Sequence, residues 1–268
     1  MLDRFDREIT YLRVSVTDRC NLRCKYCMPE EGVSLKPQEE ILTFEQVAEI
    51  CRAASGLGIW KVRLTGGEPL VRKNIVHLIR MLKEIKGIKE LCLSTNGALL
   101  APLAPELKEA GLSRVNISLD TLDAKRYREL TRGGGIHKVL EGIEAVKKAG
   151  FPKTKINMVL IPGFNTDEID RMFEFCQKNK LTLQRINQYS LNSSLKKRYY
   201  YEAERPPDCK MCNRIRLTAD GMLKPCLFSE REIPVDFNDI ESSICLAVQS
   251  KQALGQEGTR RGNWEIGG

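Results

Sequence analysis

The chain has 268 residues, of which 42% are hydrophobic and 29% charged, and its formal net charge is +8. No apolar run is long enough to span a bilayer, and the polar first ten residues lack the apolar core of a secretory signal, so we expect a globular cytoplasmic chain. The basic balance fits nucleic acid, an anionic surface or a phosphorylated small molecule, but also an ordinary solvated surface, so charge does not choose among them.

The middle of the chain alternates between strand-like and helix-like segments. Runs rich in β-branched residues are each followed by an amphipathic stretch at helical period. We expect strands at 11–17, 61–66, 89–97, 113–120, 153–161 and 181–189. We expect helices at 43–58, 74–87, 103–111, 123–130, 136–150 and 166–180. Such an α/β chain predicts a parallel sheet with outer helices, as a partial, open (β/α)6 barrel or, failing that, a doubly wound sheet.

The pattern changes after residue 189. Residues 190–208 are polar, basic and proline-bearing, as in a linker or an exposed loop. A hairpin is expected at 213–228, with its turn at Asp220-Gly221. A short helix at 239–254 and a glycine-rich, basic tail follow. The predicted organisation is a barrel over 1–189, a linker over 190–208 and a C-terminal extension over 209–268.

The chain contains ten cysteines, and six of them form two triplets. Disulfides are disfavoured in the cytoplasm, so clustered cysteines there indicate metal binding or catalysis. The triplets are Cys20, Cys24 and Cys27, then Cys209, Cys212 and Cys226. The isolated cysteines are expected in the core: Cys51, Cys92, Cys176 and Cys245.

The first triplet has the spacing C-x3-C-x2-C and follows the first expected strand. Three soft thiolates suit an iron–sulfur cluster, and three ligands on a four-iron cluster leave one iron open for a substrate or cofactor. The alternative is a zinc site with a distant fourth ligand, although neither histidine lies near a triplet in sequence.

Polar residues recur on one face of the expected strands. Side chains alternate between the two faces of a strand, so Asn116, Ser118 and Asp120 share a face. The same alternation groups Arg13 with Ser15 and Thr17, Arg63 with Thr65, and Lys155 with Asn157. Arg214 and Arg216 likewise project together beside the second triplet. We therefore expect a wet lumen whose basic side chains suit a polyphosphate.

Two motifs resemble a known superfamily. The cysteine spacing with an aromatic residue, Tyr26, before the last cysteine resembles the signature of radical S-adenosylmethionine enzymes, and "TGGEP" at 65–69 is similar to their second motif. The resemblance implies that the open iron chelates S-adenosylmethionine, which is cleaved to a 5′-deoxyadenosyl radical. The glycines would expose backbone groups to the methionyl amine.

The second triplet narrows the resemblance. It has the spacing C-x2-C-x13-C, carries R-x-R just after its second cysteine, and the chain ends in Gly-Gly. This combination resembles the GTP 3′,8-cyclase family of molybdenum cofactor biosynthesis. The resemblance implies a lyase that converts GTP to (8S)-3′,8-cyclo-7,8-dihydroguanosine 5′-triphosphate by abstracting ribose H3′, with two [4Fe-4S] clusters and S-adenosylmethionine. It also implies a reductant protein such as flavodoxin or ferredoxin, a cyclic pyranopterin synthase downstream, neither nucleic acid nor membrane as partner, and a monomer or homodimer.

Site residues follow from the same resemblance, position by position. It assigns the first triplet to the cluster that cleaves S-adenosylmethionine and the second to a cluster whose open iron meets guanine. The cofactor would contact Tyr26, Gly67, Ser118 and Tyr189. GTP would contact Arg13, Arg63, Thr95, Lys155, Arg214, Ile215 and Arg216. The catalytic set would be Arg13, Arg214 and Arg216 with the tail residues Gly267 and Gly268.

The chain also departs from that family. The segment before Cys209 is shorter than usual, and Gln184, Asn187 and Tyr189 stand where the family has arginine, an acid and methionine. Arg185 has the opposite strand parity, so it does not replace the missing arginine directly. Two alternatives stay open. One is a divergent paralogue acting on another nucleotide or a peptide, and the other is a non-catalytic metalloprotein, such as a zinc-bearing nucleic-acid binder or an electron carrier.

Overall fold

The computed structural model describes residues 1–189, 191, 201–204, 208–255 and 258–267. Its described strands form one curved sheet in the spatial order β6-β5-β4-β3-β2-β1-β7-β8-β9. The strands are β1 (Tyr11–Ser15), β2 (Lys61–Thr65), β3 (Glu90–Thr95), β4 (Arg114–Ser118), β5 (Lys155–Leu160), β6 (Thr182–Asn187), β7 (Arg214–Leu217), β8 (Met222–Lys224) and β9 (Ile233–Pro234). The first six pair in parallel, which confirms the partial (β/α)6 barrel.

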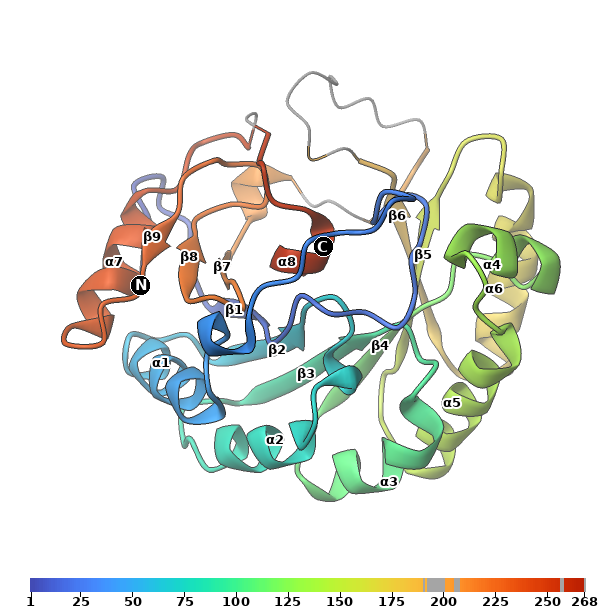
Figure 1. Cartoon of the computed structure of the whole chain (residues 1–268), viewed down its shortest axis with the longest axis horizontal. Coiled ribbons are helices and arrows are strands. Elements are labelled where there is room, and N and C mark those ends of the chain that lie inside the picture. Colours follow the sequence, from blue (N-terminus) through green and yellow to red (C-terminus); the bar gives the residue numbers. More distant parts are fainter. Residues whose placement is uncertain (190, 192–200, 205–207, 256–257, 268) are drawn as a thin grey trace.

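Helices cover the convex face of the sheet (Figure 1). They are α1 (Phe44–Gly56), α2 (Ile75–Lys83), α3 (Leu100–Glu109), α4 (Ala124–Thr131), α5 (Ile136–Lys148) and α6 (Ile169–Lys178). Local chemistry starts two of them: Thr43 and Gln46 form a capping box at α1, and the Asp123 side chain accepts from the Arg126 backbone at α4.

The hydrophobic core lies between the sheet and these helices. Leu12, Val14, Val62 and Leu64 are fully buried against it, whereas the residues that alternate with them face the concave side. The isolated Cys51, Cys92 and Cys176 are buried, as expected. The expectation for Cys245 is wrong, because this residue of α7 is only half-buried.

The C-terminal extension continues the barrel sheet. Strand β7 pairs in parallel with β1, with Arg13 opposite Arg216, and β8 turns back antiparallel to β7. Two further helices follow, α7 (Ile240–Gln249) and α8 (Asn263–Ile266). α7 ends five residues before the expected position, and α8, which was not expected, lies inside the curve of the sheet (red, Figure 1).

Within the described residues, no helix has the length and apolar character that crossing a membrane requires.

Candidate active site

The first cysteine triplet lies at the carboxyl ends of the barrel strands. Cys20, Cys24 and Cys27 come from the loop after β1 (blue in Figure 1) and line one cavity of about 180 Å³. The Leu22 backbone N–H donates to Cys20 Sγ at 3.4 Å, and Asn96 Nδ2 donates to the same sulfur at 3.8 Å. Such donors stabilise negative charge on sulfur, as an iron ligand requires.

Burial keeps these three thiols protonated without metal. Desolvation raises the pKa of Cys27 to about 12 and that of Cys24 well above its ordinary value, and the Asp120 carboxylate adds to the effect on Cys24. The pKa of Cys20 is raised by burial as well. Binding of iron must therefore displace thiol protons, so reconstitution of this site depends on pH.

The two glycines of the second motif allow its chain to touch the cysteine loop. Gly67 N–H donates to the Thr17 carbonyl at 2.9 Å, and Glu68 N–H to the Arg19 carbonyl at 2.8 Å. A Cβ on Gly66 would lie 2.4 Å from the Thr17 oxygen, and one on Gly67 would lie 2.3 Å from the Arg19 oxygen. The motif thus fixes the cysteine loop, a contact that the sequence did not reveal.

Two buried carboxyl groups face the same cavity. Glu68 accepts from Thr95 Oγ1 at 2.8 Å and the Asn96 backbone at 2.7 Å, and burial raises its pKa to about 7. Asp120 accepts from Tyr26 Oη at 2.9 Å, and burial raises its pKa to about 6. The described residues that line this cavity include no lysine or arginine.

All four residues expected at the cofactor line this cavity together with the cysteines. They are Tyr26, Gly67, Ser118 and Tyr189. The structure therefore brings them to one place, and their contacts with S-adenosylmethionine stay a prediction. Thr95, which the sequence analysis assigned to GTP, also lines this cavity and not the basic one described next.

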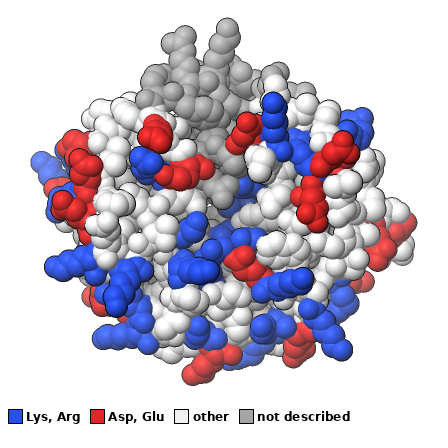
Figure 2. All heavy atoms as spheres, turned by 180° about the vertical axis from the view of Figure 1, so that it is seen from behind, with Lys and Arg blue, Asp and Glu red and all other residues white. Residues whose placement is uncertain are grey.

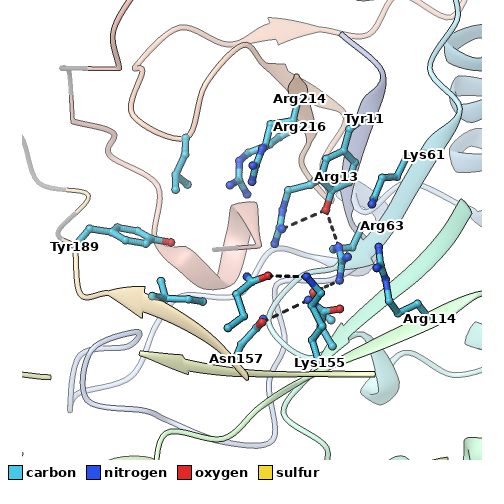
Figure 3. A pocket seen from close by; sticks show the side chains of 15 residues that line it. Tyr11, Arg13, Lys61, Arg63, Arg114, Lys155, Asn157, Tyr189, Arg214 and Arg216 are labelled. Carbon is cyan, nitrogen blue, oxygen red and sulfur yellow. Dashed lines mark hydrogen bonds between the residues drawn. The ribbon is translucent and has the colours of Figure 1, made fainter. Parts of the chain in front are cut away.

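A second cavity, of about 330 Å³, lies towards the opposite ends of the strands and is strongly basic. Figure 2 shows lysine and arginine side chains gathered in a hollow on that face. The seven cations that line it are Arg13, Lys61, Arg63, Arg114, Lys155, Arg214 and Arg216, and no carboxylate of a described residue lines it (Figure 3). Ser94, Asn157, Ile186 and Tyr189 line both cavities and mark their junction.

Tyr11 lies among these cations. Its Oη accepts from Arg63 Nε at 2.6 Å and from Arg13 at 3.5 Å, and the Arg214 guanidinium lies 5.6 Å from its ring centroid. Burial raises the pKa of Tyr11, but the Arg63, Arg13 and Arg214 charges outweigh burial and bring it to about 8. Burial and the repulsion of Arg13 and Arg214 lower the pKa of Arg216 to about 9. Such crowded positive charge favours a bound anion.

The sequence analysis named five of the seven cations and missed Lys61 and Arg114. Both pair with Glu90, which lies on β3. Of the other expected substrate residues, Ile215 is fully buried in the hydrophobic core, and its side chain does not line the cavity.

Strand β6 has the parity that the sequence predicted. Gln184 lines the basic cavity and lies 3.5 Å from Lys155 Nζ. Arg185 pairs instead with Glu204 at 2.7 Å, and Asn187 donates to the Tyr201 carbonyl at 2.9 Å. Arg185 therefore does not supply the cavity with the cation that Gln184 lacks.

The C-terminal tail reaches the junction of the two cavities. The Gly267 carbonyl accepts from Arg13 at 3.1 Å and also from Arg216. Gly267 has a φ of +62°, and a Cβ there would lie 2.2 Å from Thr65 Cγ2, so only glycine fits. Arg261 holds the tail through ion pairs with Asp220 and Glu232. Gly268 lies outside the described residues.

The second triplet lies at the basic end of the barrel. Cys209 and Cys212 directly precede β7, and Cys226 follows β8. Burial raises the pKa of the Cys212 thiol, but Lys251 and Arg214 outweigh burial and bring it below its usual value. A Cβ on Gly255 would lie 2.9 Å from Cys226 Sγ, so the chain leaves room for the sulfur only with glycine there.

Backbone donors surround the sulfurs of both triplets, as around iron–sulfur ligands. In the described chain, no three His, Cys, Asp or Glu side chains converge closely enough to hold one metal ion. A four-iron cluster takes each thiolate on a different iron, so its ligands need not converge on one point. Backbone N–H groups of Leu22, Phe228 and Gly255 lie within 3.5 Å of cysteine sulfurs, as expected around such a cluster.

Comparison with known proteins identifies the class of this site. A profile of the radical SAM superfamily matches residues 14–176. Native anSMEcpe with bound AdoMet superposes with a TM-score of 0.65 at 16% identity, over 91% of this chain and 81% of that one. SuiB of Streptococcus suis bound to S-adenosylmethionine gives 0.63 at 18% identity, over 93% and 72%. The chain belongs to the radical SAM superfamily, and these two structures support its fold.

Relatives of higher identity define the particular family. The GTP 3′,8-cyclase of Alkaliphilus oremlandii is 39% identical over 320 aligned positions, which cover all of both chains. That of Moorella thermoacetica is 44% identical over 278 positions, 88% of this chain and 86% of the relative. The chain belongs to the GTP 3′,8-cyclase family. The first alignment has more positions than this chain has residues, so the relative contains segments that this chain lacks.

Proposed function

We propose that this chain is a GTP 3′,8-cyclase that converts GTP to (8S)-3′,8-cyclo-7,8-dihydroguanosine 5′-triphosphate in molybdenum cofactor biosynthesis. The observation that carries the proposal is the contrasting chemistry of the two adjoining cavities. One has three thiols and two carboxyls, and the other has seven cations. A cationic sulfonium suits the first, and a triphosphate suits the second.

The first triplet, Cys20, Cys24 and Cys27, would hold the cluster at the carboxyl ends of the strands, and the buried thiols give up their protons to do so. Bound at that cluster, S-adenosylmethionine would supply a 5′-deoxyadenosyl radical able to take H3′ from the ribose. The buried Glu68 and Asp120 border that cavity and favour a positively charged cofactor there.

The arginines and lysines of the basic cavity would hold the triphosphate. Arg63 and Arg216 are buried, so their bonds to phosphate form in a desolvated site, where they are strong. The residues that line both cavities, among them Ser94 and Asn157, would border the ribose, between the radical source and the second triplet. Gly267 would orient Arg13 and Arg216 by accepting from both.

The second triplet, Cys209, Cys212 and Cys226, would hold the other cluster and leave one iron for guanine. This triplet lies beside β7, next to Arg214 and Arg216. The guanine base and the phosphates would therefore be held at the same end of the barrel. We further propose that a flavodoxin or ferredoxin reduces the enzyme and that a cyclic pyranopterin synthase takes its product.

The test is anaerobic reconstitution of the full chain with iron and sulfide, followed by addition of S-adenosylmethionine, a reductant and GTP. We expect 5′-deoxyadenosine and a cyclised nucleotide in equal amounts, with deuterium transferred from GTP labelled at C3′. Deoxyadenosine that forms only with another nucleotide or a peptide would indicate the divergent paralogue. Zinc bound without iron would indicate a non-catalytic metalloprotein and overturn the proposal.

A further inference from the structure

A five-residue segment after α7, Lys251–Gly255, covers the second cysteine triplet. Lys251 Nζ donates to Cys212 Sγ at 3.7 Å, and the Gly255 backbone N–H donates to Cys209 Sγ at 3.5 Å. A Cβ on Gly255 would lie 2.9 Å from Cys226 Sγ, so the Gly255 backbone packs directly against this sulfur. One short segment thus meets all three sulfurs.

The Lys251 side chain is only 2% exposed, although it carries an ammonium group. Its other two N–H donors go to the Arg214 carbonyl and the Pro225 carbonyl, each at 2.8 Å. All three donors of the ammonium are therefore used. The two carbonyls belong to the segments that carry Cys212 and Cys226, so Lys251 connects both ligand-bearing segments.

The acceptors of Lys251 leave its charge without a full counter-charge. Two of them are neutral carbonyls, and the third is a cysteine sulfur, which is a thiolate when it is a metal ligand. Burying a charge is costly unless it is paired. A four-iron cluster with a 2+ core and three thiolates has a net charge of about −1, and reduction by one electron adds another negative charge. Lys251 therefore lies where its ammonium would be next to the negative charge of such a cluster.

Arg7 holds the segment in place. Its guanidinium donates to the Cys209 carbonyl at 2.9 Å and to the Gln252 carbonyl at 2.7 Å, and Asp3 balances its charge at 2.6 Å. Arg7 thus has its own counter-ion within the described chain, whereas the sulfur of Cys212 is the group that becomes the counter-charge of Lys251.

We infer that Lys251 is the built-in counter-cation of the second cluster, which raises its reduction potential and increases the electron-withdrawing character of its open iron. Lys251 is a positioning residue, because it acts through Cys212 and does not touch the substrate. The inference rests on the proposed two-cluster function and deepens it: the protein sets the electronic state of the substrate-binding iron, not only its place.

The test uses the full chain in which Cys20, Cys24 and Cys27 are replaced by alanine, so that the second cluster is observed alone. Lys251→Met removes the charge and keeps the length, and Lys251→Arg keeps the charge. The matched control is Lys224→Met, because Lys224 on β8 is as buried as Lys251 but pairs with Glu232 at 3.0 Å. Iron and sulfide content and an EPR-monitored redox titration are measured for each chain.

We expect a lower midpoint potential for Lys251→Met than for the parent, with recovery towards the parent value in Lys251→Arg and none of this shift in Lys224→Met. Equal potentials in Lys251→Met and the parent would overturn the inference. If Lys251→Met holds no cluster, Lys251→Gln, which keeps N–H donors without the charge, must show the lowered potential; a parent-like value there indicates a purely structural lysine.

The result is independent of the proposed activity. Deoxyadenosine formation with GTP tests the function, whereas the potential of the second cluster is measured without GTP or S-adenosylmethionine. If the second triplet binds only zinc, this inference is wrong. Cleavage of S-adenosylmethionine at the first triplet is then still tested separately, by deoxyadenosine formation in the unaltered chain.

Discussion

The two ends of the barrel lumen each carry a cysteine triplet, but in contrasting electrostatic surroundings. At the carboxyl ends of the strands, three thiols with raised pKa values share a cavity with Glu68 and Asp120 and with no cation of the described chain. At the other end, seven cations line the adjoining cavity, and Lys251 brings the pKa of Cys212 below its usual value. The number of cysteines is therefore not what separates the two sites. We propose that the charge around them decides which ligand each site binds.

Loss of one cysteine at either end should have the largest effects on product formation and should separate the roles of the two triplets. We expect Cys24→Ala to abolish formation of 5′-deoxyadenosine, because the first cluster loses a ligand. Cys212→Ala should keep reductive cleavage of S-adenosylmethionine but form no cyclised nucleotide. Both products are measured by chromatography after reconstitution, together with iron content. Equal loss of deoxyadenosine in the two variants would contradict the separation of roles.

Removal of one cation should weaken only the basic end. Arg63 is 5% exposed in the lumen, and we expect Arg63→Met to raise the KM for GTP by about 10- to 100-fold, the cost of a desolvated bond to a charged group. The Kd for S-adenosylmethionine should stay unchanged. Arg185→Met is the matched control, because Arg185 lies on β6 but pairs with Glu204 outside the cavity. A similar rise in KM for both variants would show a general loss of charge instead.

The Tyr11 phenol should make GTP binding depend on pH. Its pKa of about 8 lies below the ordinary value of 10, so the fold favours the phenolate, and the free chain gains stability as pH rises from 8 to 10. The phenolate competes with phosphate for the arginines, so the KM for GTP should rise by about fivefold between pH 8 and pH 9. Tyr11→Phe should flatten this profile. Parallel profiles in the two proteins would exclude Tyr11 as the cause.

Addition of a cation at Gln184 should strengthen GTP binding at the basic end, and this is the smallest of the expected effects. Gln184 lies 3.5 Å from Lys155, on the lumen face of β6. We expect Gln184→Arg to lower the KM for GTP by about threefold, the effect of a partly solvated charge, of about 0.6 kcal/mol. Guanosine, which lacks phosphates, serves as the competitor that should not gain affinity. Unchanged KM values would place the triphosphate away from β6.

Strand alternation was enough to predict most of the barrel lumen. It placed Arg13, Arg63 and Lys155 on one face, where the structure has them. The same alternation extends one step back along β2 and β4 to Lys61 and Arg114, which lie two residues before Arg63 and Asn116. Such local periodicity is reliable because a pleated strand leaves each side chain only two directions.

The cover of the second triplet could not be predicted in this way. Lys251 follows a helical pattern that seemed to continue to Leu254, and a lysine at a helix end ordinarily faces solvent. Its burial depends on α7 ending at Gln249 and on the following chain packing across β7 and β8, which are distant in sequence. Gly255 carried no signal either, because its role depends on the position of Cys226.

The pairing of β7 with β1 makes the length of β1 set the distance between the two cysteine triplets. β1 runs from Tyr11 to Ser15, about 13 Å at the rise of a parallel strand, with one cysteine triplet beyond each end. Under the proposed function, S-adenosylmethionine and GTP would together fill this distance, one at each triplet. Removing two residues from β1 and two from β7 would keep every side chain on its face and shorten this span by about 7 Å. The length of β1 would thus set the combined reach of cofactor and substrate, independently of the side chains that hold the phosphates.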